Sequence, residues 1–326
     1  MPRPKSRRWS LAEPHGTTAG PSAFVWSVAI PALFVLLWST GFIGARLGLP
    51  DAGPMTFLAL RFGIVAAVLA LVALVTGAAW PRDALEALRY ATIGLFVHGI
   101  YLGGVFASIS LGVEAGASAL IVSIQPLLVA TTGSVLLNEA TGRRQWLGLV
   151  LGVAGVALVV GDKLAKGIGT PFGVLLSVAA LIGMTIGTIL QKRHGQGMDL
   201  RSGSAIQFAA ATLFCLLLAL AFEDIHVDWT PRFIFALGWL VLVLSFGAIS
   251  LLYLLIRRGE ATRVSSLFFL VPSSTAAIAW FLFDERMTGL SLVGMIVTMI
   301  AVALVNLPPR GAHPPRSSAQ GNVRCP

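Results

Sequence analysis

The chain has 326 residues, of which 56% are hydrophobic and only 11% are charged, and its mean hydropathy is +0.85. In soluble domains about a quarter of the residues are charged, and one soluble core cannot hide this much apolar surface. The formal net charge of +9 comes from residues that stand between apolar stretches rather than along one face, so nucleic acid is not the expected partner. The composition excludes a water-soluble protein and predicts a polytopic membrane protein.

The sequence lacks the motifs of metal, disulfide and nucleotide chemistry. The two cysteines, Cys215 and Cys325, are far apart, and the five histidines are scattered along the chain. No GxxxxGK[ST] loop is present to hold nucleotide phosphates. We therefore expect no metal, no cofactor and no ATP-driven work.

The apolar stretches have the length of membrane spans. A bilayer core about 30 Å thick needs roughly 20 helical residues, and long continuous apolar runs favour helices over barrel strands, which would alternate. The chain therefore predicts an all-α protein with ten transmembrane helices. They are expected at residues 24–45, 54–77, 90–111, 114–138, 145–161, 171–191, 203–222, 233–256, 261–283 and 289–307.

The two ends of the chain differ from its apolar middle. Residues 1–22 and 308–326 are rich in Pro, Ser, Gly and Arg, which predicts disordered tails. The first apolar run is of membrane length, so we expect an uncleaved span rather than a signal peptide. The links between the apolar runs are too short for a second domain, and one membrane domain is expected.

The basic residues predict how the chain is oriented. With the N-terminus in the cytoplasm, 17 Lys and Arg residues lie on the cytoplasmic side, 5 lie outside, and Arg61 lies within a span. The positive-inside rule then places both termini in the cytoplasm. The expected location is the inner or plasma membrane of the cell.

The chain matches itself at a shift of 146 residues, which predicts a duplication. The matched pairs are Gly41 with Gly187, Phe62 with Phe208, Glu114 with Glu260, Pro126 with Pro272, Glu139 with Glu285, and Gly148 with Gly294. Each copy would hold five helices, the first within residues 23–161 and the second within 170–307. Because five is odd, the second copy enters the membrane from the opposite side, and such inverted repeats are typical of alternating-access carriers.

Several stretches resemble the EamA family of the drug/metabolite transporter superfamily. They are WSTGFIGAR at 38–46, TFLALRF at 56–62, HGIYLGGVFASISLGVEAGASALIVSIQPLL at 98–128, LLNEATGRRQWLGLVLGVAGVALVV at 136–160 and RRGEATRVSSLFFLVP at 257–272. The resemblance implies two five-helix EamA repeats and a central cavity lined by helices 1 to 4 and 6 to 9. It also implies export of small metabolites such as amino acids or their analogues. A homodimer is an open alternative to a monomer.

Polar side chains deep in a membrane are costly and mark candidate sites. His98 lies near the middle of the third predicted helix, with Tyr101 one turn along on the same face. We expect both to line the cavity and bind substrate, and His98 is the residue that could take up a proton. The alternative is an imidazole held by a neighbouring hydroxyl or backbone group.

Two prolines interrupt helices at matched positions. Pro126 follows Ser123 and Gln125 in the fourth predicted helix, and Pro272 stands at the equivalent place in the ninth. Proline removes a backbone hydrogen bond and frees polar backbone at membrane depth. We expect both prolines to border the cavity as hinges, and Ser123 and Gln125 to contact substrate. A static kink is the alternative.

Arg61, Gln207 and Trp38 complete the expected substrate site. Arg61 is charged inside a span, and the favoured interpretation is an anchor whose side chain reaches toward the outer surface; the alternative is a cationic vestibule for substrate carboxylates. Gln207 is its repeat partner and offers uncharged hydrogen bonds. Trp38 and Tyr253 can border the cavity or lie at the membrane interface.

Glycines at spacings of four or five residues predict close helix contacts. Gly94 and Gly99 follow this pattern in the third predicted helix, as do Gly148 and Gly152 in the fifth. Small residues let two backbones approach, so we interpret them as packing positions rather than sites.

Three rival functions remain open. The first is a proton-coupled multidrug or uptake carrier, which needs a titrating group inside the membrane. No Asp or Glu lies in the middle of a predicted span, which counts against lipophilic cations as substrates. A membrane acyltransferase or lipid transferase could use His194 and Asp199, whose spacing resembles that of glycerolipid acyltransferases. A pore is the third alternative. Small-molecule substrate and membrane lipid are the expected partners in each case.

Overall fold

The computed structural model describes residues 25–113, 115–137, 141–164, 169–259, 261–283 and 288–307. These residues are helical almost throughout, and one isolated antiparallel bridge joins Ala52 to Val227. Within them, eight helices are long and apolar enough to cross a membrane, and Ile30–Ala45 forms a shorter apolar helix. The predicted all-α membrane fold is confirmed. Both predicted tails lie outside the described residues, as do Glu114, Glu139, Glu260 and Glu285.

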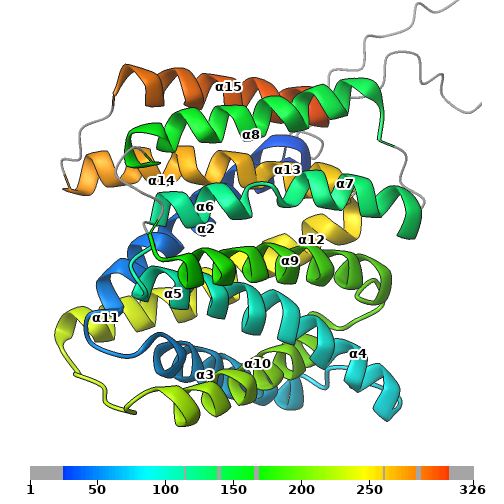
Figure 1. Ribbon diagram of the computed structural model, residues 1–326. Helices are drawn as coiled ribbons and strands as arrows, with labels where there is room; N and C mark the ends of the chain where they lie inside the picture. The colour runs from blue at the N-terminus through cyan, green and yellow to red at the C-terminus, as the bar shows by residue number, and fades with distance from the viewer. Residues whose placement is uncertain are drawn as a thin grey trace, which may run out of the picture.

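The helices follow the predicted order along the chain (Figure 1). Those of the first half are η1 (Val25–Ala29), α2 (Ile30–Gly48), α3 (Pro54–Val75), α4 (Ala84–Gly94), η2 (Leu95–Ile100), α5 (Tyr101–Ser110), α6 (Ala115–Val122), α7 (Gln125–Leu136) and α8 (Arg143–Leu164). Those of the second half are α9 (Pro171–His194), α10 (Leu200–Phe222), α11 (Pro231–Trp239), η3 (Leu240–Ala248), α12 (Ile249–Arg258), α13 (Ala261–Ser266), η4 (Leu267–Phe269), α14 (Leu270–Phe283) and α15 (Gly289–Asn306).

Local capping explains why several helices begin where they do. Thr170 and Thr230 each accept a hydrogen bond from the third backbone N–H that follows, and a proline fills the first helical position after each. Both choices satisfy or remove donors that a helix start leaves unpaired. The helix expected at 90–111 begins earlier, at Ala84, because Asp83 caps it by accepting from the backbone N–H of Glu86. Capping signals thus override the apolar pattern at this boundary.

Repeat-related helices pack against each other in layers. In Figure 1, α8 and α15 form the layer at the top, α3 and α10 lie together at the bottom, and α2, α5, α9 and α12 lie between. Glycines permit the closest contacts: a Cβ on Gly294 would lie 2.6 Å from the carbonyl oxygen of Gly155, and one on Gly148 would lie 2.8 Å from that of Ala301. The predicted glycine packing on α8 is confirmed.

The third helix of each half contains a π-helical segment at matched positions. Leu95–Ile100 forms η2, and Leu240–Ala248 forms η3. A π-helix bonds each residue to the fifth one along, so its turns hold more residues than α-helical turns. This spacing corrects the prediction that His98 and Tyr101 share one face, since His98 packs on Phe208 whereas Tyr101 packs on Trp38.

The proline-containing helices are both broken. Residues 123–124 interrupt the helix between α6 and α7, just before Pro126, and the three-residue 3₁₀ turn η4 comes just before Pro272. Pro126 cannot donate to the carbonyl of Val122, and the turn before it absorbs the loss. The predicted interruptions are therefore confirmed, while their part in any movement stays a prediction.

At one end of the bundle, the loop after α2 is tied to the loop after α10 and to the start of α11. Asp51 accepts from Arg232 Nη2 at 2.8 Å and Nε at 3.1 Å, and its backbone carbonyl accepts from the N–H of Asp228 at 2.9 Å. Glu223 accepts from the backbone N–H groups of Met55 and Thr56, at 2.8 and 2.9 Å. These contacts fix the start of α3 against the end of α10.

Acidification should weaken this tie. The hydrogen bonds from Arg232 hold the pKa of Asp51 below its ordinary value. A depressed pKa means that the stabilising contribution is complete above the ordinary pKa and is lost as pH falls through the folded-state value. We expect Asp51→Asn to lower the melting temperature in detergent by roughly 2 °C at pH 6 and by less as the pH approaches 3. Asp224→Asn, at an exposed carboxylate outside the pair, is the control; an equal effect of the two variants at every pH would contradict the role of Asp51.

Candidate functional site

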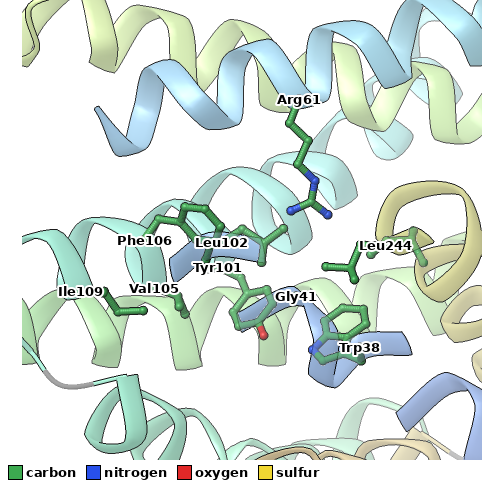
Figure 2. Close-up of a pocket in the computed structure, with 11 residues that line it drawn as sticks. Trp38, Gly41, Arg61, Tyr101, Leu102, Val105, Phe106, Ile109 and Leu244 are labelled. Atoms are coloured by element: carbon green, nitrogen blue, oxygen red, sulfur yellow. The ribbon is translucent and has the colours of Figure 1, made fainter. Parts of the chain in front are cut away.

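A central cavity lies between α2, α3, α5 and η3. In this conformation the cavity is narrow and has room for only a few water-sized molecules. The predicted site residues Trp38, Arg61 and Tyr101 all line it, although they lie on three different helices (Figure 2). The remaining walls are small or apolar: Gly41, Ala45, Leu102, Val105, Phe106, Ile109, Leu244 and Ile249. The cavity therefore combines one cation with aromatic and aliphatic surface.

Arg61 is not the surface anchor that the sequence favoured. Its side chain is only 1% exposed, and its guanidinium points into the space between Tyr101 and Leu244 (Figure 2). Arg61 Nε donates to Ser245 Oγ at 3.1 Å, and the guanidinium carbon lies 5.4 Å from the ring centre of Phe62. Arg61 lies about two turns into α3, and packing against η3 holds its side chain in the interior. Nη1 has no hydrogen-bond partner among the described residues.

A second cavity adjoins the first. It is also narrow, and it shares Trp38, Tyr101 and Val105 with its neighbour. The other walls include two predicted site residues, Ser123 and Pro272, together with Phe268 from η4. The rings of Trp38 and Tyr101 are stacked, with centres 6.4 Å apart, and Phe268 meets Trp38 edge-on at 5.2 Å. Aromatic side chains thus form the partition between the two cavities.

His98 and Gln207 lie outside both cavity linings and form a buried network. Tyr253 donates to Gln207 Oε1, so the Tyr253 oxygen must accept from His98 Nε2, 3.1 Å away. Gln207 Nε2 in turn donates to Gln191 Oε1 at 3.1 Å. Phe208 stacks on the imidazole with ring centres 4.2 Å apart. The network links η2, α12, α10 and α9, and it realises the alternative of an imidazole held by a neighbouring hydroxyl.

All three hydrogen bonds of the network run in the same direction, from donor to acceptor. His98 donates to Tyr253, Tyr253 to Gln207, and Gln207 to Gln191. His98 Nδ1 has no partner among the described residues, so a second proton on the ring would find no acceptor there. The arrangement therefore fits a neutral imidazole.

Gln125 and Pro126 are buried beside the second cavity without lining it. Gln125 Nε2 donates to Thr188 and to Ser265, both at 3.2 Å, while Oε1 has no partner in the described part of the chain. The amide therefore ties α7 to α9 and α13. Pro126 is buried at the start of α7.

Sequence reasoning missed Ser245, Gln191, Thr188 and Ser265 as partners of the predicted residues. Each is a buried polar side chain in an apolar helix, which was the only available signal. Nothing local links Arg61 to Ser245, because the two belong to different halves of the chain and meet only after helices α3 and η3 pack.

His194 and Asp199 line a polar surface hollow near the turn between α9 and α10. Asp199 caps α10 by accepting from the backbone N–H of Arg201 and also pairs with its guanidinium at 2.7 Å. The hydrogen bonds from Arg201 lower the pKa of Asp199 to about 2. A carboxylate so occupied is a poor partner for a general base, and the geometry gives the acyltransferase alternative no support.

The fold defines a class of protein: a polytopic helical membrane protein with two small cavities among its central helices. Comparison with known families names the class more closely. The family described as "EamA-like transporter family" matches residues 25–161 and 171–307. The chain belongs to this family and contains two EamA repeats.

Individual relatives agree with this assignment. A protein of Bacillus subtilis named "Uncharacterized transporter YvbV" is 28% identical, over 84% of this chain and 90% of the relative. A protein of Escherichia coli named "Probable amino-acid metabolite efflux pump" is 27% identical, over 82% of this chain and 90% of the relative. One solved crystal structure shares the fold with a TM-score of 0.72 at 20% identity, over 85% of this chain and 95% of the other.

Proposed function

We propose that this protein exports small polar or zwitterionic metabolites, such as amino acids or their analogues, by alternating access. The observation that carries the proposal is the pair of adjoining cavities at the contact between the two EamA repeats. Helices of both halves contribute to each cavity, so a relative movement of the halves would reshape both. The Escherichia coli relative, named as a probable amino-acid metabolite efflux pump, supports the substrate class and the direction.

Contacts between loops support ten spans and an inverted arrangement of the halves. The turn after α3 meets the start of α10, directly after the turn that follows α9, where Arg201 Nη1 donates to Thr76 Oγ1 at 2.6 Å. The repeat counterpart of the turn after α3 is the loop after α10. That loop meets the loop between α2 and α3, at the other end of α3, where the backbone N–H of Asp228 donates to the carbonyl of Asp51. Equivalent loops thus lie at opposite ends, as an inverted repeat requires. In the proposed organisation, residues 23–161 and 170–307 are the two repeats between cytoplasmic tails 1–22 and 308–326.

The basic residues support the proposed orientation. Lys192, Arg201 and Arg257 lie at the end of the bundle that would face the cytoplasm, and Asp51 and Glu223 lie at the other. This distribution follows the positive-inside rule. The protein is an integral membrane protein, and both termini are proposed to be cytoplasmic in the inner or plasma membrane.

The site residues have unequal support within this proposal. Trp38, Arg61, Tyr101 and Ser123 line the cavities and are the proposed substrate contacts. His98, Gln125 and Gln207 would act from behind the walls, by holding helices in place. Pro126 and Pro272 are the proposed hinges.

A flux assay in proteoliposomes tests the function. We expect purified protein to release loaded radiolabelled amino acids at a rate that saturates with concentration, above the rate of protein-free vesicles. Measurements with and without a pH gradient test proton coupling, for which the neutral setting of His98 gives no support. Flux that does not saturate would indicate a pore, and chemically altered products would indicate an enzyme. Either result would contradict a carrier.

A further inference from the structure

The cavity contains a buried positive charge that has no negative partner among the described residues. Arg61 is 1% exposed, and the ion pairs found in the described residues join Arg201 to Asp199, His226 to Asp228 and Arg232 to Asp51, none of which involves Arg61. A guanidinium stays charged in proteins. Removing such a charge from water is costly unless an anion compensates for it.

The contacts that Arg61 does make are weak substitutes for an anion. Ser245 supplies one neutral oxygen at 3.1 Å, and that hydroxyl also donates to the carbonyl of Leu240. Phe62 supplies a ring face at 5.4 Å. The guanidinium carries five N–H donors in a fixed planar array that matches a carboxylate, and its Nη1 has no partner in the described part of the chain.

The surroundings of Arg61 restrict what can approach it. The guanidinium points toward the stacked rings of Trp38 and Tyr101, and the other walls are aliphatic or small (Figure 2). When the helices move apart to admit a ligand, this space would place an anionic group on Arg61 and flat or apolar surface against the rings. A free cation would meet the charge of Arg61 with no carboxylate to offset it.

We propose that Arg61 is the carboxylate-recognition residue of the cavity, and that the transported substrates carry a carboxylate together with an apolar or aromatic body. This inference rests on the proposed carrier function and adds the substrate class. It predicts that a neutral amide or an amine with the same side chain is a poor ligand. Charge-assisted hydrogen bonds make the expected discrimination roughly tenfold or more in apparent Kd.

The first test uses wild-type protein and ligands with one ring and different charge. Binding is measured in detergent as a shift of the melting temperature with L-phenylalanine, 3-phenylpropionate, the neutral 3-phenylpropanamide and 2-phenylethylamine. We expect the two carboxylates to bind at least about tenfold more tightly than the amide and the amine. Equal affinities, or no binding by either carboxylate, would overturn the proposal.

Variants then assign the discrimination to one residue. Arg61→Gln keeps hydrogen-bond donors without the charge and should lose the preference for carboxylates, whereas Arg61→Lys should retain part of it. Arg82→Gln removes an exposed charge in the turn before α4 and is the matched control. A folded Arg61→Gln that still prefers carboxylates would overturn the proposal. If Arg61→Gln does not fold, the ligand series on wild type and on Arg61→Lys decides.

Two further arms separate this inference from its neighbours. Chloride could also supply the negative charge next to Arg61. If adding chloride abolishes the preference of the protein for carboxylate ligands, Arg61 is an inorganic-anion site and the proposal is overturned. The same four ligands are compared in the flux assay. Flux that shows no preference for carboxylates would support the proposed carrier function and contradict the role of Arg61. Binding that depends on Arg61 without any flux would contradict the carrier function.

Discussion

Gly94→Ala should prevent most of the protein from folding. A Cβ at this position would collide with the main chain of Gln207, on the neighbouring helix α10. Backbone atoms cannot turn aside as a flexible side chain can, so α4 and α10 would have to separate. Overpacking in a close-packed interior commonly lowers the free energy of unfolding by about 1–3 kcal/mol. For a clash with backbone atoms we expect a loss of roughly 3 kcal/mol or more. The measurement is the yield of monodisperse protein by size-exclusion chromatography, together with the melting temperature.

Gly238→Ala is the matched control for this prediction. Gly238 also lies in a helix, α11, but a Cβ there would meet no atom within 4 Å. Alanine favours the helix over glycine by about 0.5–1 kcal/mol, so the stability of this variant should stay the same or rise slightly. If Gly94→Ala were as stable as Gly238→Ala, the close contact between α4 and α10 would be wrong.

Tyr253→Phe should destabilise the protein by breaking the buried network at its centre. The change removes one hydroxyl and leaves two buried atoms without a partner, His98 Nε2 and Gln207 Oε1. Each such atom costs about 1–3 kcal/mol, and the side chain is otherwise kept at nearly the same volume. We expect a marked fall in the melting temperature in detergent, with little loss of helix by circular dichroism.

Tyr90→Phe provides the comparison. The Tyr90 hydroxyl donates to Glu86 Oε1 at 2.5 Å, but Glu86 also accepts from the backbone N–H of Arg82 and is only partly buried. Water can replace the lost donor there, so the effect should be smaller. A double variant, His98→Phe with Tyr253→Phe, should be less destabilised than the sum of the single variants. Additive effects, or a Tyr253→Phe variant as stable as Tyr90→Phe, would contradict the network.

Much of the fold could be predicted because its signals are local. A span of about 20 apolar residues with internal backbone hydrogen bonds is readable from the chain alone. The matched prolines, Pro126 and Pro272, likewise predicted two helix interruptions, and both are present. Boundaries were less accurate where caps extended a helix beyond its apolar core, as Asp83 does for α4.

The candidate site could be predicted only in part. Polar residues inside apolar helices identified Arg61, His98, Gln125 and Gln207, but the direction of each side chain depends on helices far away in sequence. The π-helical segment η2 rotated His98 away from Tyr101 and into the network. Trp38 was one of several aromatic candidates until the packing of α2 against α5 set it beside Tyr101.

The sequence by itself determined that this protein crosses a membrane many times, that it contains a duplicated helical unit and that it resembles EamA transporters. These properties follow from composition, from the length of the apolar runs and from the spacing of matched residues. Each can be judged segment by segment, because each span must satisfy its own backbone hydrogen bonds in lipid. Only the tertiary structure decided that Arg61 faces a cavity with Trp38 and Tyr101, while His98 is hydrogen-bonded behind the wall. That outcome depends on contacts between the two halves, where the pairing of distant helices fixes which buried polar atoms find partners and which remain for a ligand.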